Sequence, residues 1–413
     1  MRIAIDLFNP SFIILLITSQ TYSLIASIGL PYVANDKIAF LLVVIFLFAH
    51  RLSLTYREKI LLLVSFAISA LLLIFLLLRY FYFGVFVNTS SINHILAILE
   101  TILFAIYYRN FSVAVLWRSL LICLSIHLII ASIQVAFAFN GFSELTAIFS
   151  NYPPRSDYRL YAEEGLTGAV IGLPRAYGLF HEASGLSVLV GLVSLLCSLT
   201  NLRKFLPDNK IYSSMVSYIK TNCLLLAYGV FLSILGVTLT FSLTGLLYTF
   251  FPLIILTLSY SIKYVILNYK LSSPLFLLVA AIVLIPVVFN RQSVGFLVDT
   301  FTSSSRYFVT SEYLSSIPNL PDDEFFFGKA MTWEGATWDY LTRTFQVWGL
   351  IGSFLNYTWY LIILLPLNSP FSLAAFAASL SNGSLAASAS LLMLSFAIYL
   401  NFPIVPTVKH PSN

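Results

Sequence analysis

Long apolar runs, separated by polar connections, dominate this chain and limit how it can fold. Many of them approach the length of about 20 residues that an α-helix needs to cross a bilayer. Hydrocarbon cannot hydrogen-bond to an exposed backbone, whereas a helix satisfies its backbone internally, so these runs are expected to be membrane-spanning helices. The chain is 59% hydrophobic and 9% charged, with a mean hydropathy of +0.92. Because soluble domains carry roughly a quarter charged residues, the sequence predicts an all-α, polytopic integral membrane protein.

We expect about eleven spans, within a range of ten to twelve, in one transmembrane domain over residues 1–413. The run from residue 222 to residue 267 is too long for one helix and is expected to fold back near Ser242. Residues 371–380 are apolar but too few to cross, which predicts a re-entrant or interfacial piece. The expected spans are residues 11–30, 37–50, 60–78, 92–108, 113–139, 178–200, 222–240, 243–262, 272–289, 345–366 and 384–402.

Two long polar stretches, residues 140–175 and 290–345, are expected to be loops. Lysine and arginine in short connections resist translocation and therefore mark the cytoplasmic side. With a cytoplasmic N-terminus, the cytoplasmic basic residues are Arg2, Arg51, Arg57, Lys59, Arg109, Arg118, Arg203, Lys204, Lys210, Lys220, Lys263 and Lys270. The outer ones are Lys37, Arg79, Arg155, Arg159, Arg175, Arg291, Arg306, Lys329 and Arg343.

This charge distribution places both long loops outside, where acidic residues such as Asp322, Asp323 and Glu324 outnumber the basic ones. An odd number of spans also places Lys409 and His410 outside. The net charge of +5 comes from the cytoplasmic connections, so it reflects membrane topology and gives no reason to expect nucleic-acid binding.

The chain has no nucleotide-binding glycine loop and no clustered histidines, so neither an ATP-driven pump nor a metal hydrolase has support. Its three cysteines lie in or beside expected spans, without metal-ligand spacing. Within the expected spans, the polar residues Glu100, His127 and Gln134 stand out, and the last two share one helical face. We expect these three to be structural.

The most informative segment is residues 174–185, which follows the first long loop. Because proline suits the first turn of a helix, this segment is expected to open the sixth span from the outer side. Helical spacing would then place Arg175, Gly178, Glu182 and Gly185 on one face, with room beside the glycines for a ligand. The alternative is a salt bridge between Arg175 and Glu182 that only anchors the helix.

Residues 175–184, R-A-Y-G-L-F-H-E-A-S, resemble the R-x-x-G-x-F-x-E-P-S pattern of bacterial O-antigen and polysaccharide polymerases of the Wzy type, with Ala183 in place of proline. Residues 240–245, T-F-S-L-T-G, are similar to the T-F-S-R-T-G turn of that family, with Leu243 in place of arginine. The second long loop contains Ser305-Arg306 and leads into W-G-L-I-G at 348–352, which resembles the family's G-x-x-G. The resemblance covers residues 173–365 and the general order of the spans.

The resemblance implies a metal-independent, GT-C-like membrane glycosyltransferase at the periplasmic face of the bacterial inner membrane. Its donor and acceptor would both be undecaprenyl-pyrophosphate-linked oligosaccharides, and its product O-antigen or a related surface polysaccharide. A flippase and a chain-length regulator are the partners that the family implies, beside membrane lipid. The resemblance implies no cofactor.

Arginines near the outer headgroup plane suit this chemistry, because guanidinium binds phosphate oxygens in a bidentate manner. Arg175 and Arg306 stand where the family has its arginines, and Arg343 follows Asp339 by four residues. We expect these residues and Ser242 to contact substrate. The alternative is a solvated loop charge for Arg306 and a snorkelling anchor for Arg343.

The attacking sugar hydroxyl must lose a proton, and Glu182 is the best candidate to accept it, with His181 beside it. Glu182 could equally orient Arg175.

Two other functions stay open. An O-antigen ligase shares the fold and the donor but carries a histidine in its second long loop, whereas residues 290–345 contain none and have Trp338-Asp339 there. A flippase or transporter of lipid-linked oligosaccharide is less well supported, because polar residues gather at the outer edge of the expected spans.

Overall fold

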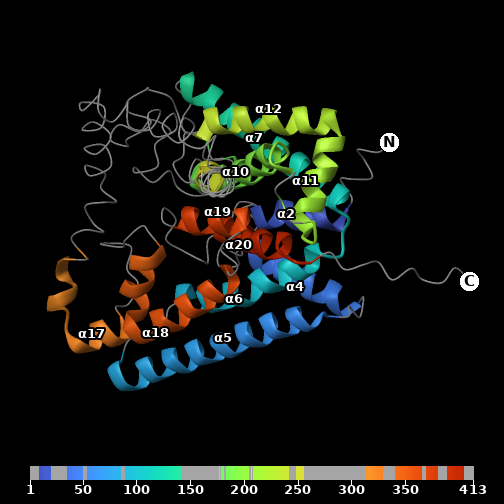
Figure 1. Ribbon diagram of the computed structural model, residues 1–413. Coiled ribbons are helices and arrows are strands. Elements are labelled where there is room, and N and C mark those ends of the chain that lie inside the picture. Colours follow the sequence, from blue (N-terminus) through green and yellow to red (C-terminus); the bar gives the residue numbers. More distant parts are fainter. Residues whose placement is uncertain are drawn as a thin grey trace, which may run out of the picture.

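Figure 1 shows the computed structural model of the chain. The structure describes residues 9–19, 35–49, 54–84, 89–140, 176, 178–180, 183–203, 206, 208–240, 248–254, 313, 315–328, 340–364, 369–379 and 388–403. In these residues the regular structure is helical, and an isolated bridge between Lys210 and Pro403 is the only β-pairing. The all-α class is therefore confirmed for this part of the chain.

The helices are α2 (Pro10–Ser19), α4 (Asn35–Ala49), α5 (Tyr56–Phe83), α6 (Thr89–Tyr108), α7 (Val113–Phe139), α10 (Ala183–Leu199), α11 (Ile211–Thr221), α12 (Cys223–Thr240), the short 3₁₀-helix η4 (Ile317–Asn319), α17 (Asp322–Phe327), α18 (Tyr340–Leu364), α19 (Pro370–Ser379) and α20 (Ser388–Leu400). In Figure 1, α7 and α12 lie on one side of the bundle and α5 lies on the opposite side, with α20 and α6 between them.

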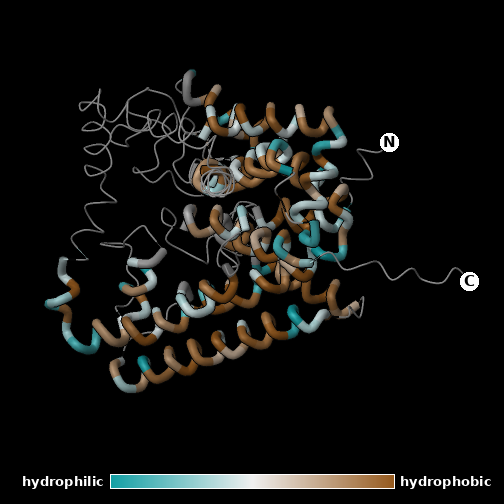
Figure 2. Tube along the Cα trace, viewed as in Figure 1, coloured by the Kyte–Doolittle hydropathy of each residue, from teal (hydrophilic) through white to brown (hydrophobic). Residues whose placement is uncertain are grey.

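Four of the described helices are long and apolar enough to cross a bilayer: Tyr56–Phe83, Ser91–Tyr108, Val113–Phe137 and Cys223–Thr240. Large apolar side chains on their outward faces are exposed, including Leu63, Phe66 and Phe81 of α5 and Leu224 of α12. Figure 2 shows this apolar character along α5. Exposed apolar surface of this extent is what hydrocarbon would cover, so the helices support a membrane protein. The expected spans 243–262 and 272–289 fall largely or wholly outside the described residues.

One end of the bundle carries ion pairs that hold basic side chains. Glu58, buried in the first turn of α5, accepts a 2.5 Å hydrogen bond from Nη1 of Arg109, which follows α6. Glu58 also completes a capping box with Thr55 at the start of α5. Arg203, after α10, donates to Asp208 at 2.6 Å. We call this the basic end. It gathers residues that the sequence assigns to the cytoplasmic connections.

The end of α20 lies at this basic end. Lys210 donates through Nζ to the carbonyl of Asn401 at 3.1 Å, and the backbone N–H of Ile211 donates to the carbonyl of Phe402. The end of the last helix therefore lies with residues of the expected cytoplasmic connections, not on the outer side that an odd span count gives it, while Lys409 and His410 lie outside the described residues. The C-terminal half of α18 also runs toward the basic end, because Trp359 donates to Ser65 in the first half of α5. The chain must then travel back between α18 and α20.

Helix α19 lies in that returning segment. It has ten residues, so the expectation that residues 371–380 are too few to cross is confirmed. It is not a surface piece, because Phe371, Ala374 and Ala378 are fully buried. Helix α11 was not expected, since the sequence assigns it to a basic connection. Its apolar residues at helical spacing, Met215, Val216 and Ile219, are buried in the bundle.

Lys37, which the sequence places at the outer start of the span 37–50, pairs with a residue inside the bundle. Its Nζ lies 2.6 Å from Oε1 of Glu100, which is fully buried in α6. Glu100 lies 11 residues after Thr89, or ~16 Å along the axis of α6, which is about half the thickness of a hydrocarbon core. The carboxylate of one helix thus draws the ammonium of another into the bundle, because a charge buried alone there is costly.

Two glycines allow the end of α17 to cross the backbone of α18. Gly328 (φ 76°, ψ 175°) follows α17, and Gly349 (φ 61°, ψ −167°) interrupts α18 with a kink. Both occupy a region of φ and ψ that is open almost only to glycine. A Cβ atom at Gly349 would lie 2.4 Å from the backbone N of Gly328. The crossing therefore requires the absence of a side chain at both positions.

We expect Gly349→Ala to lower the thermal stability of the detergent-solubilised protein sharply. A non-glycine residue in this backbone conformation costs roughly 1–3 kcal/mol, and the added Cβ also clashes with the backbone of Gly328. Gly84→Ala is the matched control. Gly84 also has a positive φ of 65°, but an added Cβ there meets no atom within 4 Å. Equal melting temperatures for the two variants would contradict the close crossing.

Candidate active site

Of the residues that the sequence singles out for the site, the structure describes Arg343. The others lie outside the described residues: Arg175, His181, Glu182, Ser242, Arg306 and Asp339. Their roles stay predictions. The structure does describe parts of the chain that adjoin several of them, and these parts form two groups. One is a turn at Gly178, and the other surrounds the first half of α18.

The turn at Gly178 departs from the expected helix. Gly178 has a φ of +62°, and α10 begins only at Ala183. The prediction that residues 175, 178, 182 and 185 share one helical face is therefore wrong. Proline at 174 is compatible with a first helical turn, but a glycine with positive φ ends regular helical geometry before α10 begins.

Two side chains of α7 hold the backbone of this turn. Gln134 donates through Nε2 to the carbonyl of Gly178 at 2.9 Å and accepts the N–H of Gly178 through Oε1 at 2.9 Å. The N–H of Leu179 donates to Nδ1 of His127 at 3.2 Å, and the His127 ring stacks on Phe180 with centroids 4.8 Å apart. Gln134 and His127 thus bind the turn to α7.

The same turn also contacts the end of α12. The N–H of Ala176 donates to the carbonyl of Leu239 at 2.9 Å. Leu239 is followed by Thr240, the last residue of α12 and the first of the second motif. Farther along, Gly236 of α12 lies against Val190 of α10, where an added Cβ would come within 2.4 Å of a Val190 methyl group. The first motif thus lies beside the start of the second, at the end of α12 remote from the basic end.

Arg343 lies on the part of α18 before the kink and is 7% exposed. Such burial does not fit a snorkelling side chain whose charge is in water. Its charge lies within electrostatic reach of His94 in α6. His94 Nε2 lies 2.8 Å from Oδ1 of Asn356, whose Nδ2 donates to the carbonyl of Gly352. Since Oδ1 can only accept, His94 is the donor in this pair.

Arg79 at the far end of α5 joins α17 to α18. Its guanidinium donates to the carbonyl of Val347 at 3.0 Å and to the carbonyl of Gly328 at 3.1 Å, and the residue is 4% exposed. The bonds fall on the backbone beside the glycine crossing. Sequence reasoning did not select Arg79 or His94 for the site, although an ionisable residue inside an apolar run is a signal for a built polar site.

Aromatic rings complete the attachment of α17. Phe327 packs on Phe75 and Phe83 of α5, with centroids 5.7 and 4.4 Å away. Phe325 meets Phe345 of α18 edge-on at 5.8 Å. Asp322 and Asp323, at the start of α17, are exposed. These two aspartates thus lie on the outside of a short helix that Phe325 and Phe327 hold against the bundle.

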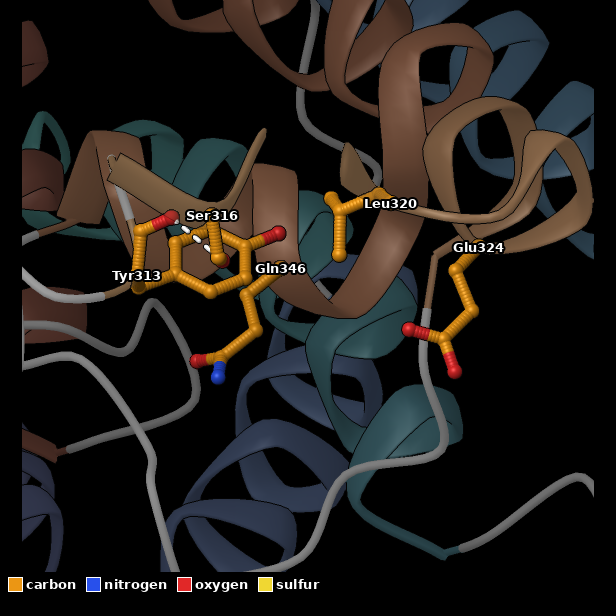
Figure 3. Close-up of a pocket in the computed structure, with 5 residues that line it drawn as sticks. All are labelled: Tyr313, Ser316, Leu320, Glu324 and Gln346. Atoms are coloured by element: carbon orange, nitrogen blue, oxygen red, sulfur yellow. Dashed lines mark hydrogen bonds between the residues drawn. The ribbon is translucent and has the colours of Figure 1, made fainter. Parts of the chain in front are cut away.

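A small cavity of about 110 Å³ lies between the segment before α17 and the first half of α18 (Figure 3). Its lining is mostly polar and consists of Tyr313, Ser316, Leu320, Glu324 and Gln346. Burial and the nearby carboxylate of Glu324 raise the pKa of the Tyr313 hydroxyl to about 12, so it is protonated and able to donate at neutral pH. Gln346 follows Arg343 by three residues, which places polar groups along this part of α18.

Comparison of the chain with known protein families and with curated proteins gives no match.

We expect Arg79→Met to lower the melting temperature of the solubilised protein, because the carbonyls of Gly328 and Val347 lose buried hydrogen bonds at a cost of roughly 1–3 kcal/mol. Lys59→Met on the same helix is the control, since Lys59 is exposed at the basic end. A melting temperature for Arg79→Met equal to that of the control would show that the guanidinium does not hold α17 and α18 together.

Proposed function

We propose that the protein is a membrane glycosyltransferase that joins undecaprenyl-pyrophosphate-linked oligosaccharide repeat units into O-antigen or a related surface polysaccharide. The observation that carries the proposal is the contact between the two motif segments. Ala176, in the motif that holds Arg175 and Glu182, bonds to Leu239, which directly precedes the motif that holds Ser242. A shared site requires such proximity, although the two segments lie 63 residues apart in the sequence.

The reaction that we propose is a displacement at the anomeric carbon of the donor. A hydroxyl at the non-reducing end of the acceptor repeat forms a bond to that carbon, and the bond to the pyrophosphate oxygen breaks. Undecaprenyl pyrophosphate leaves with the electron pair, and the hydroxyl proton passes to Glu182 or His181. Arg175, Arg306 and Arg343 would stabilise the charge that develops on the pyrophosphate.

The charge distribution supports a periplasmic site in the bacterial inner membrane. The basic end would face the cytoplasm, because lysine and arginine resist translocation. The end of α12 beside Ala176 and the cluster around Arg343 lie away from that end. Arg343 is held among buried polar residues of α6 and α18, which suits a cation that must keep its position when an anionic group arrives.

We expect Arg175→Ala, Arg306→Ala and Arg343→Ala each to abolish long-chain polysaccharide, because each removes a cation from the leaving pyrophosphate. The measurement is a gel of surface glycan from the variant strains, with protein amounts matched by immunoblot. Arg57→Ala, at the basic end, is the control and should leave chain length unchanged. Ordinary chain length in all three site variants would refute the assigned roles.

A strain that lacks the protein separates the possible functions. A polymerase deficiency leaves single repeat units attached at the cell surface. A ligase deficiency leaves no attached repeats, whereas a transport deficiency leaves repeat units on the cytoplasmic side of the membrane. Attached long chains in that strain would overturn the proposal.

A further inference from the structure

Gly178 cannot satisfy its own backbone within a helix, and it is buried. A buried N–H or C=O without a partner costs about 1–3 kcal/mol, and the cost is at least as large in an apolar bundle. Gln134 supplies both partners at once, since its amide donates to the Gly178 carbonyl and accepts from the Gly178 N–H. The two bonds, each 2.9 Å long, fix both the position and the orientation of this peptide.

His127 holds the next residue of the turn. It lies seven residues before Gln134, so the two side chains project from one face of α7, ~10 Å apart along the axis. Its Nδ1 accepts the N–H of Leu179, which places the ring proton on Nε2. The approach is close, because a Cβ at Gly178 would lie 2.9 Å from the His127 carbonyl and 3.1 Å from Nδ1. Only glycine fits between the turn and α7.

The ionisable residues of the first motif directly adjoin this held turn. Arg175 precedes Ala176, whose N–H is bound to Leu239, while His181 and Glu182 follow Phe180, whose ring is stacked on His127. Two helices, α7 and α12, therefore fix the backbone on both sides of Gly178. Gln134 and His127 are themselves fully buried, and their side chains contact the turn at Gly178, Leu179 and Phe180.

We propose that Gln134 and His127 are positioning residues, which hold the turn at Gly178 so that Arg175 and the following His181-Glu182 pair are fixed relative to the donor pyrophosphate and the acceptor hydroxyl. This inference rests on the proposed function. Fixed placement reduces the reorganisation needed to reach the transition state, and a displacement of about 1 Å can cost roughly 100-fold in rate. A structural role alone would affect only how much protein folds.

Two variants of His127 separate the hydrogen bond from the packing of the ring. His127→Asn keeps an acceptor near the position of Nδ1 but removes the ring, whereas His127→Phe keeps the ring against Phe180 and removes the acceptor. Gln134→Met keeps the length of the side chain and removes both hydrogen bonds. Ser125→Ala is the matched control, because it removes a 2.7 Å hydrogen bond between α7 and α12 that does not involve the turn.

The assay uses membrane vesicles that contain the full-length protein, with lipid-linked single repeat units extracted from the strain that lacks it. Polymer formation is measured per mole of folded protein, which is quantified by size-exclusion chromatography in detergent. We expect His127→Phe and Gln134→Met to lower kcat roughly 10- to 100-fold, with KM for the lipid-linked substrate little changed. His127→Asn and Ser125→Ala should stay within about threefold of the natural protein.

Two results would overturn the inference. If Gln134→Met or His127→Phe lowers only the folded fraction, with natural kcat per folded molecule, the residues serve stability alone. If His127→Phe is active and His127→Asn is not, the activity depends on the packing of the ring and not on the hydrogen bond to Leu179. The pair of His127 variants gives the answer even if Gln134→Met does not fold. Absence of polymer from vesicles of the natural protein is a different result, which overturns the proposed function and this inference with it.

Discussion

The satisfaction of backbone polar groups in an apolar surrounding is the constraint on which the rest of this structure depends. Within a helix the constraint is met automatically, but it returns wherever the chain departs from helical geometry among buried residues. The structure meets it twice with a long polar side chain from a neighbouring helix. Gln134 pairs with the peptide of Gly178, and Arg79 donates to the carbonyls of Gly328 and Val347. Both departures occur away from the basic end.

Each of these departures combines a glycine with a buried polar partner, and the two features depend on each other. A positive φ allows the backbone to turn away from the helix, which exposes an N–H or C=O that the helix would have used. The absence of a side chain then lets a second helix come close enough to supply the missing partner. Gly178 lies against α7 in this way. At the second departure the glycines let Gly349 lie against Gly328, and Arg79 of α5 supplies the hydrogen bonds. A bulkier residue would remove both the turn and the contact that stabilises it.

For two of the described helices, the positions followed from a long apolar run in the sequence. The expected span 113–139 coincides with α7, and the span 222–240 agrees with α12 to one residue. Contacts between distant segments could not be read in this way. The pairing of Lys37 with Glu100 depends on which helices are neighbours, and the place of α20 depends on contacts of Asn401 and Phe402 with residues near 210. The hydrophobic pattern along one sequence does not show which helices are neighbours, so it predicts neither the ion pair nor the position of α20.

The candidate site shows the same division between local pattern and tertiary contact. The motif around Gly178 was recognisable, but its helical interpretation failed because a pattern of spacing assumes a uniform φ, and one glycine with a φ of +62° breaks it. His127 and Gln134 were visible as polar residues on one face of an apolar helix, yet what they bind appears only when α7 and the turn are adjacent. Two polar residues seven positions apart in an apolar span therefore indicate that the helix hydrogen-bonds to the backbone of another segment. A glycine-containing motif is the first candidate for that segment.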